Sequence, residues 1–375
     1  MIPNKVIFAV ALLFIFGNRR LYAQPLRVRQ AGITIGVLPT GPLNAITDVP
    51  GVKVGQVTLA VADSIRTGVT AILPHGGNLF QEKVPAAIYI GNGFGKLAGY
   101  TQVKELGNLE TPIVLTNTLS VGTAVQAVVQ YTLRQPGNTQ VQSVNAVVGE
   151  TNDGYLNDIR GMHVQPHHVW QAIEQAAAGP VAEGNVGAGT GTVCFGYKGG
   201  IGTASRMLPA KAGGYTVGAL VQSNFGGVLQ VGPIPAGKLL GKYYMHDLLN
   251  ETPNGSCMMV MATDAPLDAR NLERLAARAM LGLAKTGGIA SHGSGDYVIA
   301  FSTAASLRIP YQSNNPVITQ QVLLADAVSP LFLAAIEATE EAILNSLFMA
   351  QTTRGKQGRV VEALPVGKLL QAARQ

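Results

Sequence analysis

The chain has 375 residues, of which 47% are apolar and 13% charged, and 45 are glycine. This composition excludes a disordered or fibrous protein and fits a globular chain with one large core or two smaller ones. Half of the net charge of +6 comes from Lys5, Arg19 and Arg20, and no basic run is interleaved with aromatic residues, which argues against nucleic-acid binding.

Residues 1–23 resemble a secretory signal peptide. Lys5 precedes an apolar run from Val6 to Phe16, and Ala23 provides a cleavage site before Gln24. The run is too short to span a bilayer. Because two arginines follow the apolar run, where a signal peptide has few, an uncleaved anchor is the alternative. We expect a periplasmic or secreted protein that starts at Gln24 and has no membrane association after the signal is removed.

Alternating apolar runs and turn residues predict several elements in the first half of the chain. Strands are expected near residues 67–74, 86–90, 112–116 and 146–151, a helix from the cap-like Ser120 to about Gly137, and a short helix near 169–178. The strands are mostly continuous apolar runs, which indicates sheets that are covered on both faces. This arrangement is typical of layered α/β architectures.

The second half of the chain has a clearer order of elements. A strand is expected at 215–223 and another at 257–263, followed by a helix from the cap Asp268 to Lys285, a strand at 297–303 and a helix at about 330–350. The segment after Ser256 is a βαβα piece with too few partners of its own to be independent. We therefore expect the segments before and after Ser256 to form one domain with a common core.

Ser256 lies where a flexible loop meets a buried strand. Residues 250–255 are turn-forming throughout and end in Gly255, and residues 257–263 are an apolar run of strand length. Attack of the Ser256 hydroxyl on the carbonyl of Gly255, followed by hydrolysis, would free an α-amino group with a pKa of about 7.7–8.0. That amine could then act as the base for its own hydroxyl. The alternative is an ordinary surface turn that enters a strand.

Two further polar residues lie at the start of the next predicted strand. Ser294 and Asp296 alternate, so both side chains could face the same side of the sheet. If this strand neighbours 257–263, they come near the amine of Ser256, where Ser294 could hold the amine or the hydroxyl and Asp296 could orient it. By themselves, Ser294-Gly295-Asp296 could equally be a turn.

Asn224 and Glu150 each end an apolar strand. A fixed amide at Asn224 is a suitable oxyanion donor, although Asn before a glycine-rich sequence is also common in turns. Glu150 would be costly to bury without a partner. A carboxylate at this place therefore needs a cation, either from a lysine or arginine of the protein or from the amine of a substrate.

Other polar patterns do not support a cofactor or a metal. The glycine-rich residues 187–191 lack the spacing of either nucleotide fingerprint. His163, His167 and His168 have no carboxylate or cysteine partners at a usual ligand spacing and are interpreted as exposed histidines near a helix start. No Gly-x-Ser-x-Gly sequence occurs. The two cysteines, far apart and each in an apolar segment, are expected to be buried free thiols.

A series of motifs in one order resembles a known family, the self-processing aminopeptidases that include D-aminopeptidase/L-aminopeptidase D-esterase and the β-peptidyl aminopeptidases. The motifs are ITDVPGVKVG (46–55), GVT (68–70), LTNTLSVG (115–122), ETNDGYLND (150–158), GAGTG (187–191), KGGIGTASR (198–206), NFG (224–226) and GS (255–256).

The resemblance implies a four-layer α/β/β/α sandwich that cuts itself into two chains, residues 24–255 and 256–375, which stay together. It implies Ser256 as the nucleophile, Asn224 as the oxyanion donor, Ser294 and Asp296 as supports of the new amine, and Glu150 as the anchor of the substrate amine. It also implies a homotetramer of processed pairs and no metal or organic cofactor.

Asn152 departs from the pattern of the D-aminopeptidase-like members, in which a tyrosine is expected near the reacting carbonyl. A smaller residue leaves room for a backbone one carbon longer, which favours β-amino acid residues over α-residues. The expected activity is removal of N-terminal residues from short peptides, amides or esters. An acyltransferase of the related self-cleaving fold and an uncut secreted binding protein are the alternatives.

Overall fold

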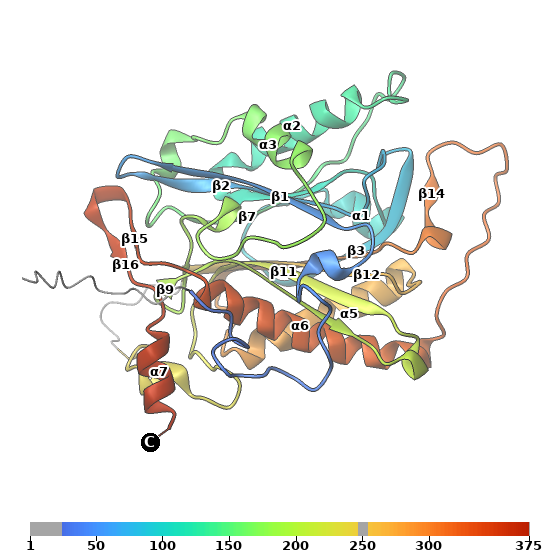
Figure 1. The fold of residues 1–375 in the computed structure, drawn as a ribbon. Helices are drawn as coiled ribbons and strands as arrows, with labels where there is room; N and C mark the ends of the chain where they lie inside the picture. The colour runs from blue at the N-terminus through green and yellow to red at the C-terminus, as the bar shows by residue number, and fades with distance from the viewer. Residues whose placement is uncertain (1–24, 247–253, 375) are drawn as a thin grey trace, which may run out of the picture.

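The structure is a computed structural model that describes residues 25–246 and 254–374. The predicted signal peptide and the residues just before the expected cut, 247–253, lie outside the described residues. Four layers are stacked in the order helices, sheet, sheet, helices (Figure 1). The predicted fold class, a four-layer α/β/β/α sandwich, is confirmed.

The first sheet has the strand order β1-β2-β6-β7-β4. Its strands are β1 (Lys53–Val61), β2 (Ile65–Leu73), β6 (Ile113–Asn117), β7 (Val147–Thr151) and the short β4 (Leu97–Ala98). β6 and β7 run parallel, so the polar residues at their carboxyl ends lie side by side: Thr116 pairs with Glu150 and Asn117 with Thr151. This edge of the sheet is where Glu150 is located.

The second sheet has the order β10-β11-β12-β13-β3-β14, with β5 also paired to β3. Its strands are β10 (Gly200–Met207), β11 (Thr216–Asn224), β12 (Asn254–Thr263), β13 (Gly293–Ser302), β3 (Glu82–Gly93), β14 (Ile309–Pro310) and β5 (Asn108–Leu109). β12 lies between an antiparallel partner, β11, and a parallel one, β13. Strands from before and after Ser256 thus share one sheet.

Two short hairpins lie outside these sheets. They are formed by β8 (Val193–Cys194) with β9 (Tyr197–Lys198) and by β15 (Thr353–Arg354) with β16 (Val360–Val361). Short helices complete the fold: α1 (Tyr100–Leu106), α4 (Ala236–Leu239) and α7 (Val366–Ala372). Among the described residues, no helix is long and apolar enough to cross a membrane.

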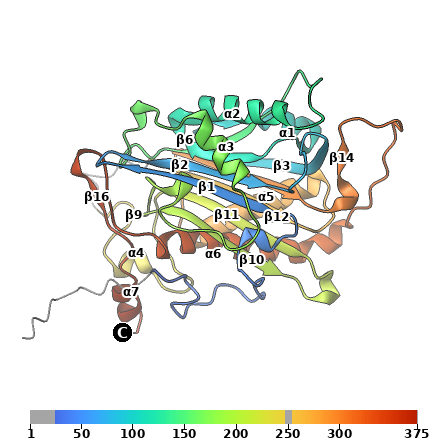
Figure 2. The same cartoon turned by 45° about the horizontal axis from the view of Figure 1, so that its top comes forward.

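Three hydrophobic clusters hold the four layers together. α2 (Val121–Arg134) and α3 (Pro166–Glu174) cover the outer face of the first sheet, and a second cluster fills the space between the sheets (Figure 2). The third cluster joins the second sheet to α5 (Ala269–Lys285) and α6 (Ser329–Phe348). Cys194 and Cys257 are both buried free thiols in this third cluster, as predicted.

Several boundaries differ from the predictions. β12 begins at Asn254 and β13 at Gly293, three or four residues earlier than expected, and α3 begins at Pro166 instead of residue 169. The residues before Cys257 and Tyr297 have the turn-forming character of a loop. They are strand because the two segments pair with each other, Asn254 with Gly293 and Gly255 with Ser294, and such pairing overrides local preference.

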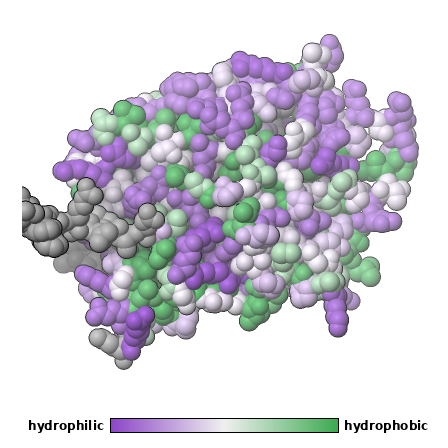
Figure 3. Space-filling view, in the orientation of Figure 1, coloured by the Kyte–Doolittle hydropathy of each residue, from purple (hydrophilic) through white to green (hydrophobic). Residues whose placement is uncertain are grey.

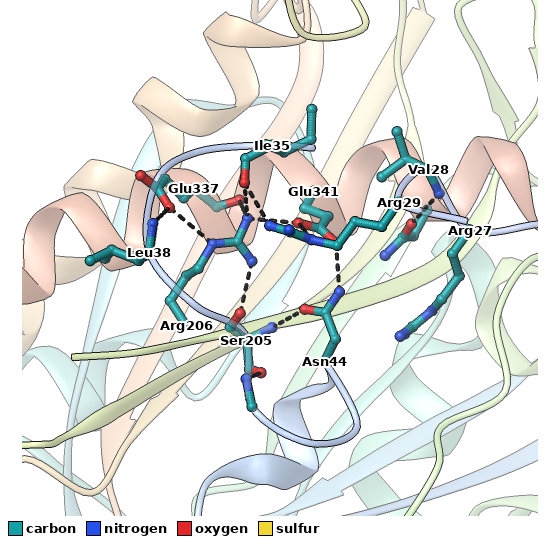
Figure 4. Close-up of polar contacts among 12 residues, drawn as sticks. Arg27, Val28, Arg29, Ile35, Leu38, Asn44, Ser205, Arg206, Glu337 and Glu341 are labelled. Atoms are coloured by element: carbon teal, nitrogen blue, oxygen red, sulfur yellow. Dashed lines mark hydrogen bonds and ion pairs between the residues drawn. The ribbon is translucent and has the colours of Figure 1, made fainter. Parts of the chain in front are cut away.

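A buried cluster of charges links the N-terminal segment to α6 (Figure 4). The guanidinium of Arg206, on β10, contacts Glu337 at 3.0 Å and Glu341 at 2.7 Å, and Arg29 contacts Glu341 at 2.8 Å. Arg206 and Glu341 have no exposed side-chain surface. Asn44 also donates to Glu341, so each carboxylate of the pair has several partners. The negative charges of the two acids in this cluster are thus offset by the positive charges of the two arginines.

Apolar side chains are exposed on the loop between β14 and α6. Val317, Ile318 and Leu324 are all exposed, and Figure 1 shows this segment, in orange, projecting from the body. Elsewhere on the face shown in Figure 3, hydrophilic and hydrophobic residues are mixed. No chemistry was predicted for this loop from the sequence, and its described side chains are not part of the site that follows.

Candidate active site

Ser256 is a buried residue near the start of the central strand β12. Its backbone is opposite Asn224 of β11 on one side and Gly295 of β13 on the other. The side chain is 5% exposed. Met258 and Val260 of the same strand point into the cluster between the sheets, and strand alternation places the Ser256 side chain on that same face.

The hydroxyl of Ser256 lies against the peptide bond that it would attack. Oγ donates to the carbonyl oxygen of Gly255 at 2.6 Å, and the backbone N–H of Gly295 donates to Oγ at 3.4 Å. A Cβ built on Gly255 would lie 3.0 Å from Cα of Phe225. Glycine therefore fits before the serine without a shift of the neighbouring backbone, whereas a Cβ would make a tight contact there.

Ser294 and Asp296 lie on the parallel neighbour, β13. Ser294 Oγ donates to Asp296 Oδ1 at 2.8 Å, and Oδ2 of Asp296 has no hydrogen-bond partner among the described residues. Burial raises the pKa of Asp296 from 3.8 to about 6, although the hydroxyl of Ser294 favours the ionised form. A buried carboxyl with one unused oxygen is able to take or hold a proton near neutral pH.

The two groups approach Ser256 from the other face of the sheet. Val298 and Ala300, in step with Ser294 and Asp296, belong to the cluster beneath α5 and α6. Ser294 hydrogen-bonds to Asp296 and not to the Ser256 hydroxyl. The backbone nitrogen of Ser256 lies in the plane of the sheet between the two faces, where an amine released by cleavage would be accessible to both.

Asn224 is on the same face as Ser256, directly across the ladder. Gln222, two residues earlier, donates to the carbonyl oxygen of Thr116 and to the hydroxyl of Thr151 in the first sheet, so this face of β11 points between the sheets. Oδ1 of Asn224 accepts from the N–H of Val193 at 2.9 Å. This contact fixes the amide so that Nδ2 is the end that can donate toward a reacting oxygen.

Glu150 lies at the carboxyl end of β7, in the sheet opposite Ser256. Its carboxylate is 3% exposed and accepts from the N–H of Lys96 at 3.0 Å and from the hydroxyl of Thr118. It forms no ion pair within residues 25–246 and 254–374. A Cβ built on Gly95 would lie 3.1 Å from Oε1 of Glu150, 3.2 Å from the ring of Tyr297 and 3.5 Å from Cα of Gly295, so Gly95 lies between the carboxylate and the strand beside Ser256.

Asn152 is exposed two residues beyond Glu150. Its Oδ1 accepts from the N–H of Gly154 at 2.9 Å, which closes a tight turn after β7. The six predicted positions other than Asn152, Gly255 among them, are buried and lie on strands of the two stacked sheets, whereas Asn152 is on a loop at the end of the first sheet.

Three groups at the site were not predicted from the sequence: the N–H of Lys96, the hydroxyl of Thr118 and the N–H of Gly295. The segment from Gly93 to Lys96 leaves β3, passes over Gly295 and supplies the N–H that binds Glu150, and Thr118 supplies the second donor. Thr118 is within one of the family motifs, which is the only sequence signal for it. The N–H groups of Lys96 and Gly295 belong to the backbone and leave no residue-type pattern.

The histidines are not gathered into a metal site. His163 lies 3.2 Å from Asp158, and the rings of His167 and His168 are 3.9 Å apart. Within the described ranges, no three His, Cys, Asp or Glu side chains are arranged to hold a metal ion. Within the glycine-rich residues 187–191, Gly187–Gly189 form a 3-10 turn that contacts strands of both sheets.

Comparisons with known proteins identify the family. The model of peptidase family S58 matches residues 44–361. The chain is 42% identical, over 370 residues, to the beta-peptidyl aminopeptidase BapA of Sphingosinicella microcystinivorans, covering 92% of this chain and 90% of the relative. A beta-aminopeptidase structure from a Burkholderia species is 43% identical with a TM-score of 0.86, covering 93% and 98% of the two chains.

A third relative connects the fold to its class. The L-aminopeptidase D-Ala-esterase/amidase of Ochrobactrum anthropi, described as a variant of the Ntn hydrolase fold, is 36% identical with a TM-score of 0.84, covering 94% of this chain and 99% of its own. The fold is thus that of N-terminal-nucleophile hydrolases. The chain belongs to peptidase family S58 and is an aminopeptidase of the hydrolase class.

Proposed function

We propose that this chain is an exported serine aminopeptidase that cuts itself before Ser256 and then removes N-terminal residues from short peptides, amides or esters. The observation that carries the proposal is the position of the Ser256 hydroxyl, 2.6 Å from the carbonyl oxygen of Gly255 and on a strand between Asn224 and Gly295. The nucleophile thus lies at this peptide bond, an amide donor is its ladder neighbour on β11, and the carboxyl of Asp296 lies on the adjacent strand β13.

In the self-cleavage step, Oγ of Ser256 attacks the carbonyl carbon of Gly255. The C–N bond breaks, the nitrogen takes a proton, and an ester joins Gly255 to the hydroxyl of Ser256. Water then hydrolyses the ester, which leaves a carboxylate on Gly255 and a free amine and hydroxyl on Ser256. Asp296, on the adjacent strand with one carboxyl oxygen unpaired among the described residues and its pKa raised to about 6, is suited to accept or return a proton of the released amine.

In the turnover that follows, the amine of Ser256 takes the proton of its own hydroxyl as Oγ attacks the substrate carbonyl. Nδ2 of Asn224 donates to the oxyanion, and the leaving amine carries the proton away. Ser294 and Asp296 keep the Ser256 amine in place. Water cleaves the acyl-enzyme and releases the N-terminal residue.

Glu150 supports the restriction to N-terminal residues. Its carboxylate is buried, accepts two hydrogen bonds and has no cationic partner among the described side chains. A buried negative charge without a counter-ion is costly, and the ammonium group of a substrate would provide one. Holding that ammonium at a fixed distance from Ser256 selects the terminal residue.

We propose β-amino acid residues as the favoured substrates, with α-residues accepted more slowly. Two of the compared relatives are named beta-peptidyl aminopeptidase and beta-aminopeptidase, and Asn152 stands where a bulkier tyrosine is expected in the D-aminopeptidase-like members. Rates for β-alanyl and L-alanyl p-nitroanilide test this preference. A higher kcat/KM for the L-alanyl compound would contradict it.

Three further proposals concern the whole protein: export to the periplasm or the medium, a lasting pair of the two cut chains, and a homotetramer of such pairs. The signal-like residues 1–23 support export. Terminal sequencing of the secreted protein, with size measurement by light scattering, tests all three. A protein retained in the cytoplasm, or one that is monomeric at micromolar concentration, would contradict the corresponding proposal.

The main test is the substitution Ser256→Ala. The wild-type chain should appear on a denaturing gel as two fragments, 24–255 and 256–375, and the variant as one uncut chain without activity, because both reactions use the same oxygen. Mass spectrometry identifies the termini. Folded Ser256→Ala protein that still yields these fragments would refute the assignment.

A further inference from the structure

Lys198 is a fully buried lysine that the reaction does not use. Its Nζ donates to the carbonyl oxygen of Gly189 at 2.9 Å and to that of Gly199 at 2.8 Å. The two carbonyls bracket residues 190–198, which contain the β8–β9 hairpin. One amine therefore closes this segment of chain into a ring at its base.

The ring is joined to the site through the hairpin. Val193, directly opposite Lys198 in the β8–β9 ladder, gives its N–H to Oδ1 of Asn224. The N–H of Gly199 also donates to the carbonyl oxygen of Thr192, next to Val193, at 3.1 Å. Lys198 holds the open end of the β8–β9 hairpin. The position of that end sets the position of the Val193 N–H and, with it, the direction of the Asn224 amide.

We propose that Lys198 is a positioning residue for the oxyanion donor: by holding the carbonyls of Gly189 and Gly199, it sets the hairpin whose Val193 N–H orients the amide of Asn224. This inference rests on the proposed role of Asn224. Lys198 touches neither the substrate nor the reacting atoms and acts only through the fixed amide.

The other end of the hairpin is held by a backbone hydrogen bond to β11's end, so its base is the end that the lysine can position. The N–H of Phe195 donates to the carbonyl oxygen of Phe225 at 2.7 Å, and Phe195 and Gly196 form the tight turn, both with positive φ. The hydroxyl of Thr192 also reaches Gly189, at 3.1 Å. Without the lysine, the carbonyl of Gly199 loses a donor and the base of the hairpin can shift.

The contacts of Lys198 do not depend on its protonation state. Burial lowers the pKa of Lys198 to about 7, opposed by attraction to the buried Asp153. The neutral amine still has two protons, one for each carbonyl. The same burial raises the pKa of Asp153 to about 7, and Cys194 beside them stays a thiol because burial raises its pKa to about 12.

A double-mutant cycle tests the proposal. Asn224→Ala should lower kcat by about 10²–10³-fold, the usual cost of one oxyanion donor. Lys198→Met should lower kcat by about ten- to a hundredfold with KM within twofold. The double variant should be no slower than Asn224→Ala, because Lys198 has no effect once the amide is gone. Rates are expressed per free Ser256 amine, and the same cycle is measured on self-cleavage, so an uncut variant still gives a rate.

The outcomes separate the inference from the function on which it depends. Costs that multiply in the double variant, or a kcat unchanged in Lys198→Met, overturn the role of Lys198 while Asn224 keeps its own. An unchanged kcat in Asn224→Ala overturns the role of Asn224 and the inference with it. If Lys198→Met does not fold, the paired variant Lys198→Met with Asp153→Asn removes both buried charges and enters the same cycle.

Lys242→Met is the matched control. Lys242 also contacts the hairpin, with Nζ 4.4 Å from the ring centre of Tyr197, but makes no contact with Gly189 or Gly199. It should keep the wild-type kcat. An equal fall in kcat for both lysine variants would mean that any disturbance of the hairpin slows the enzyme, and the specific role of Lys198 would be rejected.

Discussion

At the scale of single residues, Glu150 is the group whose loss should separate binding from chemistry. Glu150→Gln keeps the shape and removes the charge that an ammonium group would meet. We expect KM for substrates with a free amine to rise by about ten- to a hundredfold, from the loss of a charged hydrogen bond, with kcat changed much less. Steady-state kinetics measure the two constants.

The control for Glu150 is in the substrate. An N-acetylated ester carries no ammonium group, so its slow hydrolysis should be the same in wild type and Glu150→Gln. Equal rises in KM for both substrates would mean that the substitution distorts the site, and unchanged KM for the free amine would remove the proposed role of Glu150.

Asp296 makes the stability of the uncut chain dependent on pH. Its pKa is raised on folding from 3.8 to about 6, so the folded state binds the proton more tightly than the unfolded state. The stabilisation is complete below about pH 4 and is lost as the pH rises through about 6. Asp296→Asn should therefore match the parent below pH 4 and melt at a higher temperature above pH 6.

This comparison is made in the Ser256→Ala background, because an ammonium group at residue 256 would favour the charged carboxylate. Thermal unfolding between pH 4 and 7.5 gives the result. Asp63→Asn, in the exposed turn between β1 and β2, controls for the loss of one negative charge. A Tm difference for Asp296→Asn that stays constant over this range would contradict the prediction.

At the scale of elements, the buried ion cluster should contribute far more than an exposed pair. Arg206→Met leaves Glu337 and Glu341 with one cation fewer in the interior, and we expect a loss of about 3–5 kcal/mol in the free energy of unfolding. Lys104→Met breaks the exposed pair with Glu273 and should cost at most about 1 kcal/mol. Denaturant titration measures both.

The cluster is remote from Ser256, so folded Arg206→Met protein should keep its turnover per free amine. Equal stability losses in the two variants would show that the cluster is no more than a surface contact in energetic terms. A large loss of kcat with stability intact would place Arg206 in the site, which its contacts do not suggest.

The sequence predicts which elements exist better than where they begin. Long apolar runs such as 257–263 and the amphipathic pattern of α5 are strong local signals. The start of β12 is different, because Asn254 and Gly255 become strand only through partners far away in the chain. The same reason explains the site: Ser256, Ser294 and Asp296 could be singled out, but their approach from opposite faces depends on the parallel pairing of β12 with β13.

The backbone N–H groups of the site could not be predicted from the sequence. The N–H of Lys96 binds Glu150 and the N–H of Val193 binds Asn224, and any residue except proline offers the same group. Lys198 was part of a motif, but only the fold shows that its amine holds two carbonyls. The motifs therefore indicate which segments contribute to the site, and the fold shows which of their atoms are in contact.

At the scale of the whole molecule, the two proposed chains are interleaved. β12 and β13, from residues after 256, lie between β11 and β3, from residues before it, and α6 carries the acids of the ion cluster. Separating the chains would break three strand ladders: β11 with β12, β13 with β3, and the short pairing of β14 with β3. We expect the cut chains not to exchange partners under native conditions.

Mixing cut protein with an isotope-labelled sample tests this expectation. Native mass spectrometry should detect no hybrid pairs after a day at neutral pH, and hybrids should form after unfolding and refolding of the mixture. Hybrids that form within hours without denaturant would contradict the interleaved arrangement.

The position of the proposed cut, near the start of a central strand, would also make folding a one-time event. An intact chain finds its own β11 and β3 in a unimolecular process, at a rate that does not depend on dilution. Once hydrolysed, the same sheet can be rebuilt only by collision of two separate molecules, so the rate of recovery from denaturation should fall as the protein is diluted. The lifetime of the mature enzyme is then set by its unfolding rate.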